Sequence, residues 1–195
     1  MKELIVATAN KGKINEFDLL FKDLSLPIKL ISFQNLNFFE DVPETGNSFK
    51  ENAFQKAEFV FKKFNIPVVS DDSGLEIKIL NNQPGVLSAR YAGIEKDDAK
   101  NRKLVLDNLK DIKDRDARFV CCLCYYDGNK KKIFEGFLEG KINTAEVGEN
   151  GFGYDSVFIP KGYSKTMAEL SMEEKNKLSH RAIAMKLFVE FLRNS

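Results

Sequence analysis

LIVATANKGKINEFDLLF, residues 4–21, predicts a strand, a polar loop and a helix in that order. Residues 4–7 form a continuous apolar run, which is typical of a strand that is buried on both faces. The polar residues 8–13 end that run, and apolar residues then recur at helical spacing over 14–21. The chain therefore begins with a strand–loop–helix unit.

The rest of the chain alternates helices and strands in its first half and changes to hairpins in its second half. A capping box, Ser48 with Glu51, starts a helix over 49–64, and a second helix is expected over 97–109. A final amphipathic helix is lined by Ile183, Leu187, Val189, Phe191 and Leu192. Strands are expected over 28–32, 68–70, 75–79, 117–126, 131–138 and 156–159. This order predicts a single α/β domain over residues 1–195, elongated, with a mixed sheet.

Composition excludes several classes of protein. The chain is 43% hydrophobic, which allows a substantial core and excludes disorder as a whole. Lys and Arg number 30 and Asp and Glu 29, so the net charge is +1. A chain without a basic excess lacks the driving force for duplex nucleic-acid binding, so we expect no nucleic-acid partner.

The three cysteines lie in one apolar run, Cys121, Cys122 and Cys124, which indicates small apolar residues inside a strand. His180 is the only histidine, so a zinc site lacks ligands, and free thiols favour a reducing compartment. The apolar run near the N-terminus is too short for a signal peptide or a membrane span. We therefore expect a cytoplasmic protein with no membrane partner.

Residues 8–13 are the first candidate site, because ligands of α/β sheets gather at the carboxyl ends of strands. The N-terminus of the following helix suits phosphate, and Lys13 adds a positive charge. The spacing is not that of a Walker A loop. The alternative is an ordinary strand-to-helix turn in which Asn10 caps the helix.

The acidic stretch 71–74 is the second candidate, since Asp71 and Asp72 follow the buried strand 68–70 directly. Buried carboxylates are costly unless a cation meets them, and Mg²⁺ favours a few carboxylates together with phosphate oxygens. Glu44 is a candidate third acid at such a site. The alternative is a turn whose acids point into water.

Two further segments stand out. Residues 151–155 are glycine-rich, and Phe152 and Tyr154 offer rings on which a base could stack, although a hairpin turn also explains them. Residues 173–181 end in Ser179, His180 and Arg181, with Ser179 resembling a helix N-cap. Cations at that helix end are unfavourable, which suggests an anionic or carbonyl partner, against the alternative of a solvated charged face.

Taken together and in this order, these segments resemble the inosine triphosphate pyrophosphatase family of bacterial type. The matching stretches are 5–13, 44–46, 51–53, 56–57, 70–75, 84–86, 88–91, 151–155 and 179–181. The resemblance implies a two-lobed fold around a long central mixed sheet with flanking helices and an active-site cleft between the lobes. It also implies a homodimer and one Mg²⁺ per subunit. The implied reaction is hydrolysis of ITP, dITP or XTP to the monophosphate and pyrophosphate, which cleanses the nucleotide pool.

The resemblance also assigns roles to residues. It implies that Asp72 accepts a proton and binds the metal with Glu44, and that Lys13 holds the triphosphate. Lys56, one helical turn after Asn52, could reach phosphate, so we expect Lys13 and Lys56 to act in catalysis. The residues that it implies for substrate binding are Thr8, Ala9, Asn10, Lys11, Gly12, Lys13, Ser73, Phe152, Gly153, Tyr154, Asp155, Lys175, His180 and Arg181. Arg181 carries hydrogen-bond donors only, so it would favour a 6-oxo group over the amino group of adenine.

Three other functions remain open from the sequence. A pyrophosphatase for modified pyrimidine nucleotides, of the septum-related type, shares the strand–loop–helix start but lacks the ending 179–181. A non-catalytic nucleotide- or RNA-binding module would gain nothing from Glu44, Asp71 and Asp72 beside its phosphate site. A structural protein would require all these motifs to be coincidental turns.

Overall fold

The computed structural model describes residues 2–23 and 28–194, without the side chains of Lys2, Lys11, Glu16, Leu19, Leu20, Lys22 and Asp23. Its contacts divide the chain into two compact units. Unit 1 comprises residues 1–72, 121–136 and 181–195, and unit 2 comprises residues 73–120 and 137–180. The chain thus passes between the units four times.

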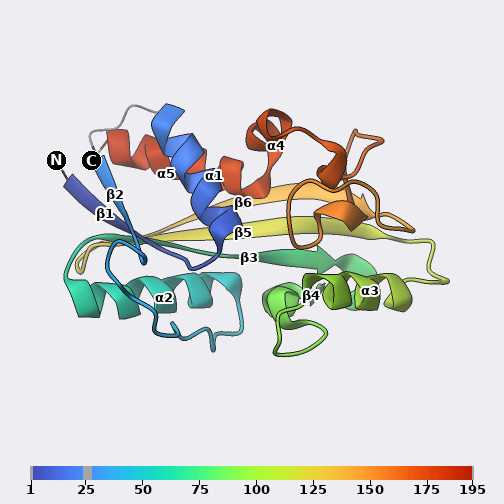
Figure 1. Cartoon of the computed structure of the whole chain (residues 1–195), viewed down its shortest axis with the longest axis horizontal. Helices are drawn as coiled ribbons and strands as arrows, with labels where there is room; N and C mark the ends of the chain where they lie inside the picture. The colour runs from blue at the N-terminus through green and yellow to red at the C-terminus, as the bar shows by residue number, and fades with distance from the viewer. Residues whose placement is uncertain (1, 24–27, 195) are drawn as a thin grey trace. The chain divides into compact units, whose positions relative to one another are not determined.

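A mixed sheet forms the centre of the fold (Figure 1). Its order over the described residues is β2 (Ile28–Ser32), β1 (Lys2–Ala7), β3 (Val68–Ile77), β5 (Asp116–Tyr126), β6 (Lys131–Ile142) and β7 (Phe158–Pro160), and β4 (Gln83–Pro84) pairs with β3. Strand β1 is parallel to β2 and β3, whereas β4 and β7 pair antiparallel to their neighbours. The predicted α/β class and its long mixed sheet with flanking helices are confirmed.

In unit 1, helices α1 (Lys11–Asp23) and α5 (His180–Arg193) lie on one face of the sheet and α2 (Phe49–Phe64) on the other (Figure 1). Phe17 of α1 packs with Met185 and Phe188 of α5, and all three side chains are buried. The α2 face that is buried carries Ala53, Ala57 and Val60 at helical spacing. Both faces of β1 and β3 are therefore covered, which explains their continuous apolar runs.

Unit 2 is built on α3 (Asp98–Asn108), α4 (Met172–Leu178) and short 3-10 turns. The turns are η1 (Lys78–Leu80), η2 (Gly85–Arg90), η3 (Asp155–Val157) and η4 (Met167–Glu169). The core joins Val105 and Leu109 of α3 to Leu75 and Ile77 of β3 and to Phe158 of β7. Helix α3 thus packs on this core through one side, while its first residues, Asp98, Ala99 and Lys100, are exposed.

Three predictions about strands were wrong. The strand predicted over 75–79 ends at Ile77 as part of β3, because η1 begins at Lys78. The acidic stretch 71–74 is not a turn after a short strand but lies inside β3, which runs unbroken from Val68 to Ile77. Acids lie in a buried strand here because cations from other elements compensate them, as described below. The strand predicted over 156–159 begins only at Phe158, since η3 occupies the preceding residues.

The predicted apolar face of the last helix was also wrong in part. Ile183 is 36% exposed and Leu187 45% exposed, whereas Ala184, Met185 and Phe188 are fully buried. The packing against α1 selects the face, and small residues such as Ala184 fit there although they contribute little to an apolar pattern.

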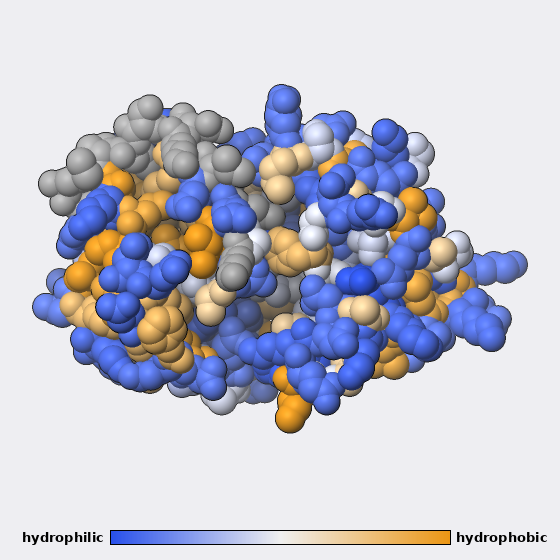
Figure 2. Space-filling model, viewed as in Figure 1, coloured by the Kyte–Doolittle hydropathy of each residue, from blue (hydrophilic) through white to orange (hydrophobic). Residues whose placement is uncertain are grey.

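The cysteines and the surface agree with the sequence analysis. Cys121, Cys122 and Cys124 are buried and form no disulfide. Hydrophilic side chains cover most of the face in Figure 2, as expected of a chain that is 30% charged. None of the helices in the described part of the chain is long and apolar enough to span a membrane.

Candidate active site

The carboxyl ends of β1 and β3 bring the first two candidate segments together in unit 1. These strands are parallel, with Ala7 opposite Ser70, so Thr8 and Asp71 follow at neighbouring positions. Helix α1 begins at Lys11 and carries Lys13, whose Nζ lies 2.9 Å from Asp71 Oδ2. The positions predicted from 8–13 and 71–72 therefore form one site.

Asp71 is the centre of a buried ionic group. Its carboxylate is fully buried and contacts Lys13 Nζ at 2.9 Å and Arg181 Nε at 3.4 Å. Burial alone would raise the pKa of Asp71, but the charges of Lys13 and Arg181 hold this pKa well below its usual value. Asp71 is therefore ionised and holds two cations in place, which makes it an anchor and unsuited to accept a proton.

Asp72 has a different environment. Lys56 Nζ lies 3.3 Å from Asp72 Oδ1 and 2.8 Å from Glu44 Oε1, and Asn52 Nδ2 donates to Asp72 Oδ2 at 3.1 Å. Burial raises the pKa of Asp72 above its usual value, with Lys56 and Lys13 opposing and Glu44 adding to the rise. The more basic of the two neighbouring acids is therefore the one suited to accept a proton.

Lys56 remains an ammonium ion despite its burial. Burial lowers the pKa of Lys56, but Asp72, Asp71 and Glu44 outweigh this effect and raise it above its usual value. Lys56 was predicted to act in catalysis by reaching phosphate, and that role stays a prediction. The structure brings it into contact with the two predicted metal ligands, Glu44 and Asp72.

Helix α2 positions Asn52 and Lys56 one turn apart on one face. Its N-cap is Ser48, whose side chain accepts from Glu51 N at 3.2 Å, as the capping box predicted. Asn52 Oδ1 accepts from Gly46 N at 2.7 Å, and Ser70 Oγ donates to the carbonyl of Ala53. The first bond ties α2 to the segment that precedes it, and the second ties α2 to β3 immediately before the two acids.

Local hydrogen bonds join residues 8–10 to the first turn of α1, which begins at Lys11, three residues earlier than the sequence predicted. Thr8 Oγ1 accepts from Asn10 N, and Asn10 Oδ1 accepts from Lys13 N, each at 3.2 Å. Asn10 thus caps α1, as the alternative interpretation expected, and the N-terminus of α1 faces the same region as Lys13. Ala9 is exposed and Gly12 half-buried, while the side chain of Lys11 lies outside the described residues.

The residues predicted to bind the base lie in unit 2, where Asp155 is central. Lys175 Nζ contacts Asp155 Oδ2 at 2.9 Å and donates to Asn150 O at 3.3 Å, with Lys175 only 5% exposed. Asp155 Oδ2 also accepts from Phe152 N at 3.4 Å. Asp155 and Lys175 therefore shape the loop 151–155 from within.

Tyr154 does not offer a stacking face, which corrects the prediction. Its ring belongs to the core of unit 2 and is 5% exposed, and its hydroxyl donates to Ser88 O at 2.7 Å. Phe152 is half-buried and keeps the role of the candidate stacking ring. The sequence could not separate these two aromatic residues because both flank Gly153 in the same glycine-rich stretch.

The ending 179–181 is at the junction of α4 and α5. His180 and Arg181 are the first residues of α5, as expected, and Ser179 ends α4 with its N–H on Lys175 O. In unit 2, the ring of His180 is buried and stacks on Phe119, with centroids 4.9 Å apart. Ser73, directly after Asp72 in β3, is half-buried.

Glu44 and Asp72 can serve a metal ion only as a pair. Within the described residues there is no group of three or more His, Cys, Asp or Glu side chains placed to hold one. Both carboxylates nevertheless lie within 3.3 Å of the same nitrogen, Lys56 Nζ. Mg²⁺ commonly takes one or two carboxylates and completes its shell with water and substrate phosphates, so this donor pair fits it.

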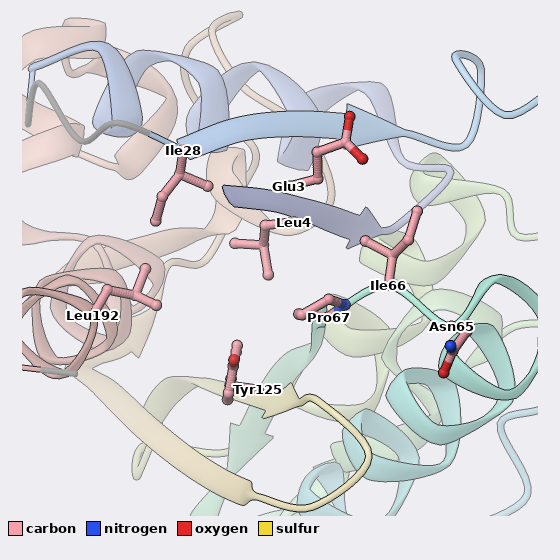
Figure 3. A pocket seen from close by; sticks show the side chains of 8 residues that line it. All are labelled: Glu3, Leu4, Ile28, Asn65, Ile66, Pro67, Tyr125 and Leu192. Carbon is pink, nitrogen blue, oxygen red and sulfur yellow. The ribbon is translucent and has the colours of Figure 1, made fainter. Parts of the chain in front are cut away.

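Unit 1 also contains a pocket of about 370 Å³, but it lies at the other end of the strands (Figure 3). Leu4 and Ile28 from the starts of β1 and β2, with Pro67 before β3, surround it together with Tyr125 and Leu192. Ligands of parallel strands bind at the carboxyl ends, where the acids lie. The pocket is therefore separate from the candidate site around Asp71 and Asp72.

Comparison with known proteins decides the family. The family model described as Ham1 family matches residues 4–191. The chain belongs to the Ham1 family. The dITP/XTP pyrophosphatases of Halalkalibacterium halodurans and Bacillus subtilis are 49% and 48% identical to it, over 98% of this chain and 100% and 98% of theirs. The Ham1 protein structure from Staphylococcus aureus aligns with a TM-score of 0.89 at 43% identity, covering 99% of each chain. That of the Coxiella burnetii HAM1 protein aligns with a TM-score of 0.92 at 38% identity, covering both chains fully.

The resemblance inferred from the sequence of this Ham1 chain is thereby confirmed. The structure adds Asn52, Asp98 and Arg102, which sequence reasoning left without a role, and it pairs Asp71, which had been a candidate acid of the metal site, with Lys13 and Arg181. The sequence does point to Asp71, because two adjacent acids in an apolar strand point to opposite faces of the sheet and each needs its own cation. It does not point to Asp98 and Arg102, because they resemble ordinary charged residues of an exposed helix face.

Proposed function

We propose that this Ham1 chain is a nucleoside triphosphate pyrophosphatase that hydrolyses non-canonical purine nucleotides, dITP, XTP and ITP, to the monophosphate and pyrophosphate. The observation that carries the proposal is the contrast between Asp71 and Asp72. One carboxylate is held ionised by Lys13 and Arg181, and its neighbour is made more basic by burial. A module that only binds polyanions would gain nothing from the second carboxylate, that of Asp72, because an acid repels phosphate.

The chemistry follows from these positions. Water attacks the α-phosphorus while Asp72 orients it and takes its proton, and the bond from the α-phosphorus to the bridging oxygen breaks so that pyrophosphate leaves. Lys13 and the N-terminus of α1 bind the phosphates, with Thr8 and Asn10 shaping that loop. Lys56 holds Asp72 and Glu44 in place and offsets their charge. When these carboxylates hold Mg²⁺, the ion supplies positive charge against the phosphate oxygens.

We assign the preference for 6-oxo purines over adenine to hydrogen-bond donors of the protein. Lys175 and Arg181 carry only donors, and an adenine amino group facing such donors would leave polar groups unpaired. Unpaired polar groups in a water-excluding site give large discrimination. Phe152 stacks on the purine, and His180, held against Phe119, contributes to the same recognition.

Three finer features belong to the proposal. Mg²⁺ is the metal, because the hard oxygen pair Glu44 and Asp72 suits it. The enzyme acts in the cytoplasm, which the three free, buried thiols support. It acts as a homodimer, as the resemblance to its family implies, and light scattering of the purified protein measures this directly.

A substrate panel tests the function. Purified protein with Mg²⁺ receives ITP, dITP, XTP, GTP, ATP and dUTP separately, and pyrophosphate and orthophosphate are measured independently. We expect pyrophosphate from the three 6-oxo nucleotides without a 2-amino group, slower release from ATP and GTP, and none without divalent metal. Orthophosphate as the product would contradict the mechanism, and preference for dUTP would favour the pyrimidine alternative.

A further inference from the structure

The first turn of α3 grips one residue of the loop 151–155. Asp98 Oδ2 accepts the N–H of Gly153 at 2.9 Å, and Arg102 Nη1 donates to the carbonyl of Gly153 at 3.0 Å. Asp98 and Arg102 are one helical turn apart and so face the same way. The two peptide groups that flank Gly153 are therefore both fixed by side chains of one helix.

Contacts other than the N-cap hold the part of α3 that carries Arg102. Asn101, the residue before Arg102, is 2% exposed, donates to Ala89 O at 3.0 Å and accepts from Ala92 N at 2.7 Å. Arg102 is held in turn by Glu146, whose Oε2 lies 2.7 Å from Arg102 Nε. Val105, further along α3, is fully buried. Arg102 is therefore held by Glu146 and by a partly buried helix, whereas Asp98 is exposed and has the Gly153 N–H as its partner.

The loop requires such support. Two residues of the loop have a positive φ, Gly151 at +93° and Gly153 at +59°. Glycine can adopt many other φ and ψ values, so a glycine-rich loop loses much conformational entropy when it takes one conformation. Fixing the N–H and the carbonyl of Gly153 removes rotation of both neighbouring peptides. The direction of the Phe152 side chain before it and of Asp155 after it depends on those two peptides.

We propose that Asp98 and Arg102 are positioning residues for purine recognition, which hold the Gly153 peptides so that the loop 151–155 is preorganised for the base. This inference rests on the proposed function, in which that loop reads the purine. A preorganised loop lowers the ordering cost of binding, so the pair acts on KM and on selectivity and leaves kcat nearly unchanged.

The test compares neighbouring variants on α3. Asp98→Ala removes the acceptor and should raise the KM for ITP about five- to ten-fold, with a smaller change for ATP, while kcat stays within about two-fold. Asp98→Asn keeps an acceptor oxygen and should restore the KM. Asp97→Ala removes the N-cap and a 3.9 Å contact with Lys100 but neither bond to Gly153, so it should lower the Tm and leave the KM unchanged.

Arg102 has an equally close control. Arg102→Ala should raise the KM for ITP to a similar extent, whereas Lys103→Ala, at a neighbouring exposed position paired with Asp107, should not. If Asp98→Ala and Asp97→Ala lower the Tm alike and neither changes KM or the ratio of kcat/KM for ITP and ATP, Asp98 is only structural and the inference is wrong.

Amide hydrogen exchange separates this inference from the proposed function. The Gly153 amide should exchange markedly faster in Asp98→Ala than in the wild type and in Asp97→Ala. Unchanged exchange in all three would overturn the grip on Gly153. A wild-type enzyme that releases no pyrophosphate from any 6-oxo purine would instead overturn the proposed function, with the exchange result standing by itself.

Discussion

The charged side chains described above bind different partners in the two units. In unit 1 they pair with one another: Asp71 takes Lys13 and Arg181, and Asp72 shares Lys56 with Glu44. In unit 2 they hold the backbone of a loop, since Asp98 and Arg102 bind the two polar groups of Gly153. The first arrangement sets the pKa values of acids, and the second sets the shape of a surface. Handling phosphate and protons requires the former, and recognising a flat base requires the latter.

The largest expected effect is the loss of activity in Asp72→Asn. Removing the proton acceptor should lower kcat by about 10²- to 10⁴-fold for ITP. Since burial disfavours the ionised form of Asp72, the neutral amide should leave the free energy of unfolding unchanged or slightly higher. Steady-state kinetics and urea denaturation measure both effects.

Glu76→Gln is the matched control, because Glu76 lies on the same strand and pairs with Arg118 at 2.7 Å. It should retain kcat within about two-fold of the wild type. An Asp72→Asn enzyme with wild-type kcat would remove Asp72 from the proton-accepting role.

The neighbouring variant Asp71→Asn should instead reduce stability. It leaves Lys13 and Arg181 without their shared carboxylate in a buried position, which typically costs about 3–5 kcal/mol. Urea denaturation measures the change in the free energy of unfolding. The exposed pair Glu173–Lys177 supplies the control, and Glu173→Gln should have no measurable effect.

Equal stability losses in Asp71→Asn and Asp72→Asn would contradict the distinction drawn between these two acids. The distinction would be sharpened if only Asp72→Asn kept wild-type stability while losing turnover.

Gly153→Ala should act on the backbone of the unit 2 loop alone. A Cβ at Gly153 would meet no atom within 4 Å, so the cost comes from its left-handed φ of +59° and is about 1–2 kcal/mol. We expect a higher KM for ITP, and a smaller rise in Gly153→Asn, because asparagine tolerates this conformation better. Equal KM values for all three proteins would show that the loop conformation does not limit binding.

The smallest effects are expected from two helix caps. Ser48→Ala in α2 and Ser171→Ala in α4 each remove a cap bond of 3.2 Å and should cost about 1 kcal/mol of stability. The seven-residue α4 carries Lys175 to Asp155, so only Ser171→Ala should also raise the KM for ITP. Thermal melts with parallel kinetics would show the difference, and a higher KM in Ser48→Ala would contradict it.

The sequence by itself determined the features that depend on neighbouring residues. The strand at 4–7, the helix capped by Ser48, the hairpin between β5 and β6 and the burial of the cysteines all follow from local pattern. Each is set by side-chain periodicity or by a bond spanning three or four residues, which a linear chain displays directly. The order of the motifs was also sufficient to indicate the family.

Only the tertiary structure decided which contacts the individual residues make. Asp71 and Asp72 are adjacent and chemically identical, and Arg181, 110 residues from Asp71, is one of the groups that make them differ. Asp98 meets Gly153 across 55 residues, and Tyr154 enters the core while Phe152 stays half-buried. The pKa of an acid and the fixed conformation of a loop depend on which distant groups packing brings within a few ångströms, and a sequence does not state those distances.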